Sequence, residues 1–129
     1  MTDRNRVCII DDDIDLVMLF SDALALSGFR TCGFDNPMDA IKYLNIHHDK
    51  FRLVVTDWRM PEMGGKEIIK LVSQMDSNIG IIMISAFEFD DDELLEIPKE
   101  EIIQKPIHIA HFVDAIKEKM NPLYEICVG

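Results

Sequence analysis

The chain has 129 residues, enough for one compact domain, and its 48% hydrophobic content is typical of a globular protein. A formal net charge of −11 disfavours direct binding to nucleic acid or to anionic membranes. Ten of the 24 acidic residues lie in two short segments, 11–15 and 88–96, and the other 14 nearly balance the 13 basic residues. We therefore interpret the chain as a nearly neutral domain with two acidic patches.

Short apolar segments alternate with segments of helical periodicity along the chain. Strands are predicted at 7–10, 30–34, 53–56, 79–84 and 102–104. Helices are predicted from 14 to about 28, from 37 to about 48, over 68–75 and over 109–120, with a short helix at 91–96 left open. In the first helix, Val17, Met18 and Leu24 are placed on the inner face. Because the strands are hydrophobic throughout, we expect an α/β domain whose parallel sheet is covered on both faces.

Cysteine usage and the ends of the chain limit where the protein works. Cys8, Cys32 and Cys127 are an odd number without the spacing of a metal site, so we interpret them as packing residues. The apolar segment 7–10 is too short for a signal peptide, and nothing approaches the length of a membrane span. We expect a cytoplasmic, single-domain protein over 1–129, with a core at 7–120 and a tail at 121–129.

Polar side chains follow the predicted strands at their carboxyl ends. The first strand runs into the acidic triplet 11–13, and Asp57, Ser85 and Lys105 follow the third, fourth and fifth strands. The carboxyl ends of parallel strands meet at one edge of the sheet, where such folds bind their ligands. Clustered carboxylates repel one another unless a cation balances them, and a site with few oxygen ligands and retained water favours Mg²⁺. A lysine and a serine beside that metal are suited to hold phosphoryl oxygens.

These segments resemble the receiver domain of two-component response regulators. The resemblance is carried by the segments 8–13, 54–65, 81–86 and 103–106, in this order. It implies a flavodoxin-like (βα)5 three-layer sandwich with strand order 2-1-3-4-5. It also implies a phosphorylation-dependent switch, not an enzyme, that receives its phosphoryl group from a sensor histidine kinase or a phosphotransfer protein. Signalling would then proceed by contact with an unknown protein target, as a monomer or weak dimer, from a chain that stands alone or belongs to a longer regulator.

The resemblance assigns a role to each residue of the acidic site. Asp57 is the phosphoacceptor, and it ligates Mg²⁺ directly together with Asp12. The backbone carbonyl of Arg59 supplies a third protein ligand, and Asp11 acts mainly through water. Ser85 donates its hydroxyl to a phosphoryl oxygen.

Lys105 completes the implied site, but its surroundings depart from the family pattern. The family implies that Lys105 pairs with Asp57 before phosphorylation, with a cis peptide bond before Pro106. Ile102 stands where receivers usually carry an aromatic residue, and segment 85–105 lacks the usual Ala-Gly-Ala pattern. We therefore transfer the phosphorylation site but not the output mechanism, and we expect any partner of patch 88–96 to be basic.

One hypothesis concerns the rate at which the phosphoryl group is lost. Arg59 and Phe87 lie two residues beyond Asp57 and Ser85 and border the path of an attacking water molecule. Their bulk is expected to slow hydrolysis of the aspartyl phosphate.

We also consider two alternative functions and a purely structural role for some of these residues. A haloacid-dehalogenase-like phosphatase would use Asp11 and Asp13, but Asp15 stands where that family expects Thr or Val, and Asp57 would have no role. A receiver that binds without being phosphorylated fits Ile102 but not the complete acidic site. Asp13 and Asp15 are interpreted as helix-capping residues, and the histidines as solvated surface, namely His47, His48, His108 and His111.

Overall fold

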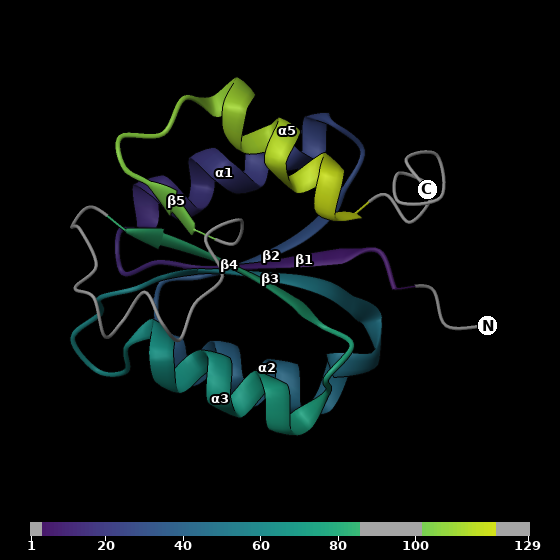
Figure 1. Cartoon of the computed structure of the whole chain (residues 1–129), viewed down its shortest axis with the longest axis vertical. Coiled ribbons are helices and arrows are strands. Elements are labelled where there is room, and N and C mark those ends of the chain that lie inside the picture. Colours follow the sequence, from purple (N-terminus) through teal and green to yellow (C-terminus); the bar gives the residue numbers. More distant parts are fainter. Residues whose placement is uncertain (1–3, 86–101, 121–129) are drawn as a thin grey trace.

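The computed structural model describes residues 4–85 and 102–120 (Figure 1). Phe87, the acidic patch 88–96 with the open helix at 91–96, and the tail 121–129 lie outside the described residues. The predictions made for these segments therefore remain predictions.

A five-stranded sheet forms the centre of the fold. Its strands are β1 (Arg6–Ile10), β2 (Arg30–Phe34), β3 (Phe51–Asp57), β4 (Gly80–Ser85) and β5 (Ile102–Gln104). All neighbouring strands pair in parallel, in the order β2-β1-β3-β4-β5. This confirms the predicted flavodoxin-like strand order, and it brings the carboxyl ends of all five strands to one edge.

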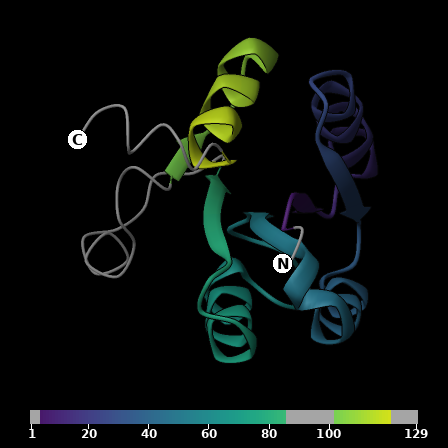
Figure 2. The same ribbon diagram turned by 90° about the vertical axis from the view of Figure 1, so that its right-hand side faces the viewer.

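Helices cover both faces of the sheet, which gives the predicted three layers. The described helices are α1 (Ile14–Leu26), α2 (Pro37–His47), α3 (Gly65–Met75) and α5 (Ile109–Met120), with a 3-10 turn, η1, at His48–Lys50. Figures 1 and 2 show α2 and α3 on one face of the sheet and α1 and α5 on the other. No helix among the described residues is long and apolar enough to cross a membrane.

Alternate residues of the central strands pack into two separate cores. Cys8 and Val54 belong to the core under α2 and α3, whereas Ile9 and Val55 belong to the core under α1 and α5. In the second core, Phe20 of α1 stacks on a phenylalanine of α5, Phe112, with ring centroids 4.4 Å apart. Because both faces are covered, these strands need apolar residues at every position, which explains their unbroken hydrophobic sequence.

The inner face of α1 differs from the prediction at one residue. Val17 and Leu24 are buried as expected, but Met18 is 57% exposed and Phe20 is buried instead. Residues 17, 20 and 24 follow the 3.6-residue period, and residue 18 is rotated away from that line by about 100°. Helix α1 thus leaves large apolar side chains, among them Met18, facing outward.

Helix α1 begins and ends at residues that commonly cap helices. The carboxylate of Asp13 caps α1 by accepting hydrogen bonds from the backbone amides of Asp15 and Leu16. Asp15 therefore lies in the first turn of α1 and is not itself the cap. Gly28, with φ of 93°, ends this helix in the left-handed region that glycine adopts readily.

Helix α3 begins directly against the end of β3, earlier than the predicted start at residue 68. A Cβ atom on Gly65 would lie 2.9 Å from Sδ of Met83 and 3.0 Å from the backbone oxygen of Asp57. The absence of a side chain at Gly65 therefore lets α3 approach the last residue of β3.

Candidate functional site

The carboxyl edge of the sheet brings together side chains at or just after the ends of four strands. Asp11 comes directly after β1, Asp57 and Ser85 are the last residues of β3 and β4, and Lys105 follows β5. Asp11, Asp57 and Ser85 are only 2%, 7% and 1% exposed, whereas the neighbouring Asp12 faces solvent. The site is therefore a buried acidic floor that opens to solvent at Asp12.

Three of these carboxylates are close enough to share one cation. Asp11, Asp12 and Asp57 each offer a carboxylate oxygen, and these three oxygens lie within 4.8 Å of one another. Oxygen is the ligand that hard divalent cations prefer, and a site with three carboxylates and an open side leaves room for bound water, as Mg²⁺ requires. The residues present therefore fit the metal that the sequence predicted.

Lys105 lies between the two buried carboxylates and closer to Asp11. Its Nζ donates a hydrogen bond to Oδ2 of Asp11 at 3.2 Å and lies 3.7 Å from Oδ2 of Asp57. The backbone N–H of Lys105 donates to the carbonyl of Ser85 at 2.7 Å, and the expected cis peptide bond precedes Pro106. The family resemblance implied a pair with Asp57, and the structure gives Lys105 a second, closer carboxylate, Asp11.

The ammonium group of Lys105 does not balance the negative charge of the three carboxylates. Burial, followed by the negative charges of Asp11 and Asp12, raises the pKa of Asp57 to about 6, against the opposing effects of Lys105 and the Trp58 amide. Burial also raises the pKa of Asp11, although the Asp13 amide and Lys105 act in the other direction. The site therefore favours the arrival of further positive charge.

Backbone hydrogen bonds hold Asp57 and the loop after it. The N–H of Trp58 donates to the carbonyl of Ile84 in β4 at 2.9 Å, and the N–H of Gly65 donates to the carbonyl of Trp58 at 2.8 Å. Trp58 is buried in the core under α2 and α3, while Arg59 is exposed at the rim. Asp57 is thus anchored at the junction of β3, β4 and α3.

A contact that the sequence did not reveal ties this loop to the start of α2. Nδ2 of Asn36 donates to Oε2 of Glu62 at 3.2 Å, while Oδ1 of Asn36 caps α2 by accepting from the Met38 and Asp39 amides. The capping role is visible in the Asn-Pro sequence, but nothing in the sequence pairs residues 36 and 62. Asn36 therefore connects the loop that carries Arg59 to a rigid helix end.

The remaining candidates lie away from the site. His108 and His111 are exposed, as predicted for solvated surface. His48 differs, because its Nδ1 lies 2.9 Å from Oδ2 of Asp76 near the amino edge of the sheet. Ile102 packs, partly buried, against the core under α2 and α3.

Comparison with known proteins identifies the family. The family model of the response regulator receiver domain matches residues 7–117. The chain belongs to this family. A response regulator receiver protein of Brucella abortus, CpdR, is 30% identical over 119 residues, which cover 89% of this chain and 95% of CpdR. Two other curated relatives are much longer, since the matches cover only 17% and 49% of their lengths.

Solved structures of the family share the fold. A response regulator receiver domain protein from Clostridium thermocellum has a TM-score of 0.81 at 18% identity, covering 95% of this chain and 98% of its own. The CheX–CheY–BeF3–Mg²⁺ complex from Borrelia burgdorferi gives a TM-score of 0.77 at 24% identity, covering 88% and 87%. Membership of the receiver family argues against the haloacid-dehalogenase-like alternative, which would leave Asp57 without a role.

Proposed function

We propose that this receiver is a switch operated by phosphorylation of Asp57. The observation that carries the proposal is the convergence of three carboxylates within 4.8 Å, with the Lys105 ammonium 3.7 Å from Asp57. An oxygen of Asp57 attacks the phosphorus of a phosphohistidine on a histidine kinase or phosphotransfer protein. The phosphorus–nitrogen bond breaks, and the departing imidazole nitrogen keeps the electron pair.

Each side chain of the site has a part in this transfer. The carboxylates of Asp11, Asp12 and Asp57, with the backbone carbonyl of Arg59, would hold Mg²⁺, which when bound offsets the repulsion between Asp57 and the anionic phosphoryl group. Ser85 donates its hydroxyl to one phosphoryl oxygen. Lys105 exchanges its contact with Asp11 for a second phosphoryl oxygen, a short movement because its Nζ already lies between the two carboxylates.

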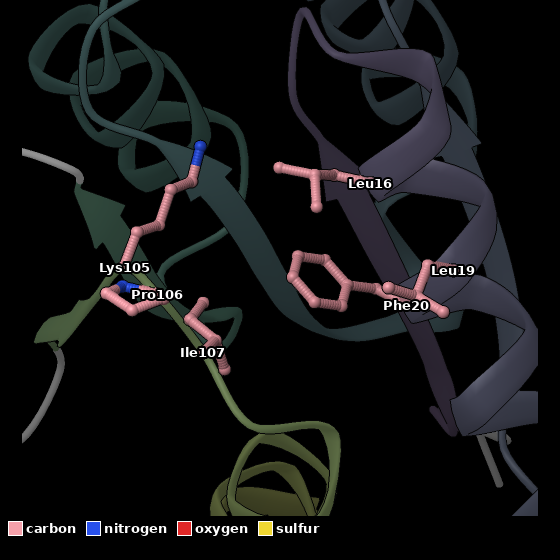
Figure 3. Close-up of a pocket in the computed structure, with 6 residues that line it drawn as sticks. All are labelled: Leu16, Leu19, Phe20, Lys105, Pro106 and Ile107. Carbon is pink, nitrogen blue, oxygen red and sulfur yellow. The ribbon is translucent and has the colours of Figure 1, made fainter.

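A groove beside the site offers the phosphoryl donor a place to dock. Its cavity of about 540 Å³ is lined by residues of α1 and of the connection between β5 and α5, namely Leu16, Leu19, Phe20, Lys105, Pro106 and Ile107. Figure 3 shows the side chains of Leu16 and Phe20 pointing across the groove toward Lys105 and Ile107. An apolar side chain of the donor would bury itself here, and its histidine would then face Asp57 across Lys105.

The wider role follows from the family. We propose that the protein acts in the cytoplasm as a regulatory domain without a substrate of its own. It would pass its signal to a downstream protein by direct contact, as a monomer or weak dimer and without binding nucleic acid or membrane. This part of the proposal is supported by the receiver family and by the negative charge of the chain.

The test uses the fluorescence of Trp58, which is buried directly after Asp57. Adding Mg²⁺ with acetyl phosphate, or with beryllofluoride, is expected to change the emission of the wild type. The change should disappear in Asp57→Asn and persist in the matched control Asp15→Asn, which removes an exposed carboxylate from the same segment.

Two other outcomes would contradict the proposal. A response that survives in Asp57→Asn, fails in Asp11→Asn and accompanies turnover of external phosphate esters would indicate a phosphatase. The absence of any response in the wild type would indicate a receiver that acts by binding alone.

A further inference from the structure

The amino edge of the sheet carries charge opposite to that of the acidic site. Five basic residues lie within two residues of the first residues of β1, β2 and β3, and we call this set the basic edge: Arg4, Arg6, Arg30, Lys50 and Arg52. The strand register brings them together, because Arg6 pairs with Arg30 on one side and with Phe51, between Lys50 and Arg52, on the other. In a chain of net charge −11, the topology has thus gathered five of 13 basic residues at one edge.

Two carboxylates at this edge, Asp76 and the exposed Asp49 next to Lys50, balance part of this charge. Arg4 forms an ion pair with Asp76 at 2.7 Å, which accounts for one of the five positive charges. Arg30 and Lys50 are exposed, and no carboxylate among residues 4–85 and 102–120 forms an ion pair with either. Arg6 and Arg30 also stand directly opposite each other, and such like-charged pairs destabilise a sheet. Arg4 and Arg52 serve the fold, because Arg4 donates a hydrogen bond to the carbonyl of Phe51 and Nε of Arg52 donates to the carbonyl of Arg4. Among residues 4–85 and 102–120, no such contact explains the placement of Arg30 and Lys50.

The basic edge is electrostatically separate from the acidic site. β1 has five residues, so the two edges of the sheet lie about 16 Å apart at roughly 3.3 Å per residue. This is about twice the Debye length at physiological ionic strength, roughly 8 Å. A partner at the amino edge therefore experiences a positive surface despite the negative charge of the whole protein.

We propose that the basic edge is a docking surface for an aspartate- and glutamate-rich segment of another protein, independent of phosphorylation at the opposite edge. Charge complementarity favours an acidic partner. A long nucleic acid is disfavoured because it would also meet the acidic remainder of the protein. A second copy would have to place its acidic edge on this basic edge, and such a head-to-tail contact gives a ring or an open chain instead of the common two-fold dimer.

The test measures binding of a short, fluorescein-labelled peptide rich in Glu and Asp by fluorescence anisotropy. The double variant Arg30→Glu/Lys50→Glu is expected to weaken binding by about tenfold or more. The matched control Lys42→Glu/Lys70→Glu makes the same change in net charge on the exposed surfaces of α2 and α3, and it should lower affinity by no more than about twofold. The first variant should fold, because Arg30→Glu replaces a like-charged pair with an oppositely charged one. Thermal unfolding of both variants checks this.

Four results would overturn the proposal. One is the absence of peptide binding to the wild type, and another is an equal loss of affinity in both double variants. Tighter binding of a DNA oligonucleotide, lost in Arg30→Glu/Lys50→Glu, would assign the surface to nucleic acid. Concentration-dependent self-association of the wild type, lost in the same variant, would assign it to a second copy of the chain.

Discussion

The two edges of the sheet affect carboxylates with little side-chain exposure in opposite ways. At the amino edge, Asp76 accepts hydrogen bonds from Arg4 at 2.7 Å, from the Asn78 amide at 3.0 Å and from His48, whose Nδ1 lies at 2.9 Å. Burial works to raise the pKa of Asp76, but these hydrogen bonds lower it to about 2. At the carboxyl edge, burial and neighbouring carboxylates raise the pKa of Asp57 to about 6.

This difference separates a structural carboxylate from one available to a ligand. Asp76 accepts hydrogen bonds from three chain segments, so it stabilises their packing at the amino edge. Asp57 and Asp11 share one ammonium group, that of Lys105, so their negative charge is not balanced until a cation binds. The uncompensated negative charge lowers the stability of the carboxyl edge when no cation is bound. The same charge favours binding of a cation there.

The largest expected effect comes from adding the cation. At a Mg²⁺ concentration about 100 times its dissociation constant, the free energy of unfolding of the wild type should rise by about 2.7 kcal/mol. Urea denaturation with and without Mg²⁺ measures this increase. It should vanish in Asp57→Asn and remain complete in Asp76→Asn. An equal increase in both variants would show that Mg²⁺ does not distinguish the two edges.

The next effect is the loss of the Asp76 contacts. Asp76→Asn should lower the free energy of unfolding by about 2 kcal/mol at pH 7, because charged hydrogen bonds in a buried site are lost. The pKa of Asp76 is lower in the folded state than its ordinary 3.8, so its contribution is present above about pH 4 and is lost as the pH falls toward 2. The control Asp49→Asn changes an exposed carboxylate at the same edge and should have little effect. If Asp76→Asn lowered the free energy of unfolding at pH 2 as much as at pH 7, the stabilising role of ionised Asp76 would be refuted.

Asp57→Asn should act in the opposite direction when no divalent cation is present. Its pKa is raised in the folded state, so ionisation of Asp57 costs stability as the pH rises from about 4 through 6. Removing the carboxylate should therefore increase the free energy of unfolding by on the order of 1–2 kcal/mol at pH 7 and by almost nothing at pH 4. Denaturation in EDTA across this range measures the difference, and a gain that does not change with pH would contradict it.

The smallest effect concerns the bond between Asn36 and Glu62. Asn36→Asp keeps the cap of α2 but places a carboxylate against Glu62, which should loosen the loop carrying Arg59. Mg²⁺ affinity, followed by Trp58 fluorescence, should fall by about two- to threefold, as expected for one exposed hydrogen bond. In the double variant with Glu62→Gln, the amide at position 62 donates to the carboxylate at position 36. The Mg²⁺ affinity should then be restored. A double variant as weak as Asn36→Asp alone would exclude this role.

The sequence predicted the site better than its detailed contacts. Asp11, Asp57, Ser85 and Lys105 each follow an apolar strand, so a parallel sheet necessarily brings them to one edge. The strand order itself came from the family resemblance, because strand periodicity does not specify which strands are neighbours.

Contacts between distant segments were beyond prediction. Asp76 meets Arg4 and His48 only after three parts of the chain have folded together, and nothing in its local sequence marks it as buried. The closer approach of Lys105 to Asp11 than to Asp57 is likewise a difference of less than one ångström between two acceptors. Side-chain geometry at this scale depends on the packed structure and not on residue spacing.

Gly65 has a consequence for how this receiver tolerates change. A Cβ atom at this position would lie 3.0 Å from the carbonyl oxygen of Asp57 and 2.9 Å from the sulfur of Met83, so any side chain there would displace one or the other. Position 65 takes no part in the chemistry, yet a survey of tolerated substitutions should find it as restricted as the acidic site itself. When α3 is exchanged between related receivers, the junction must therefore preserve this glycine.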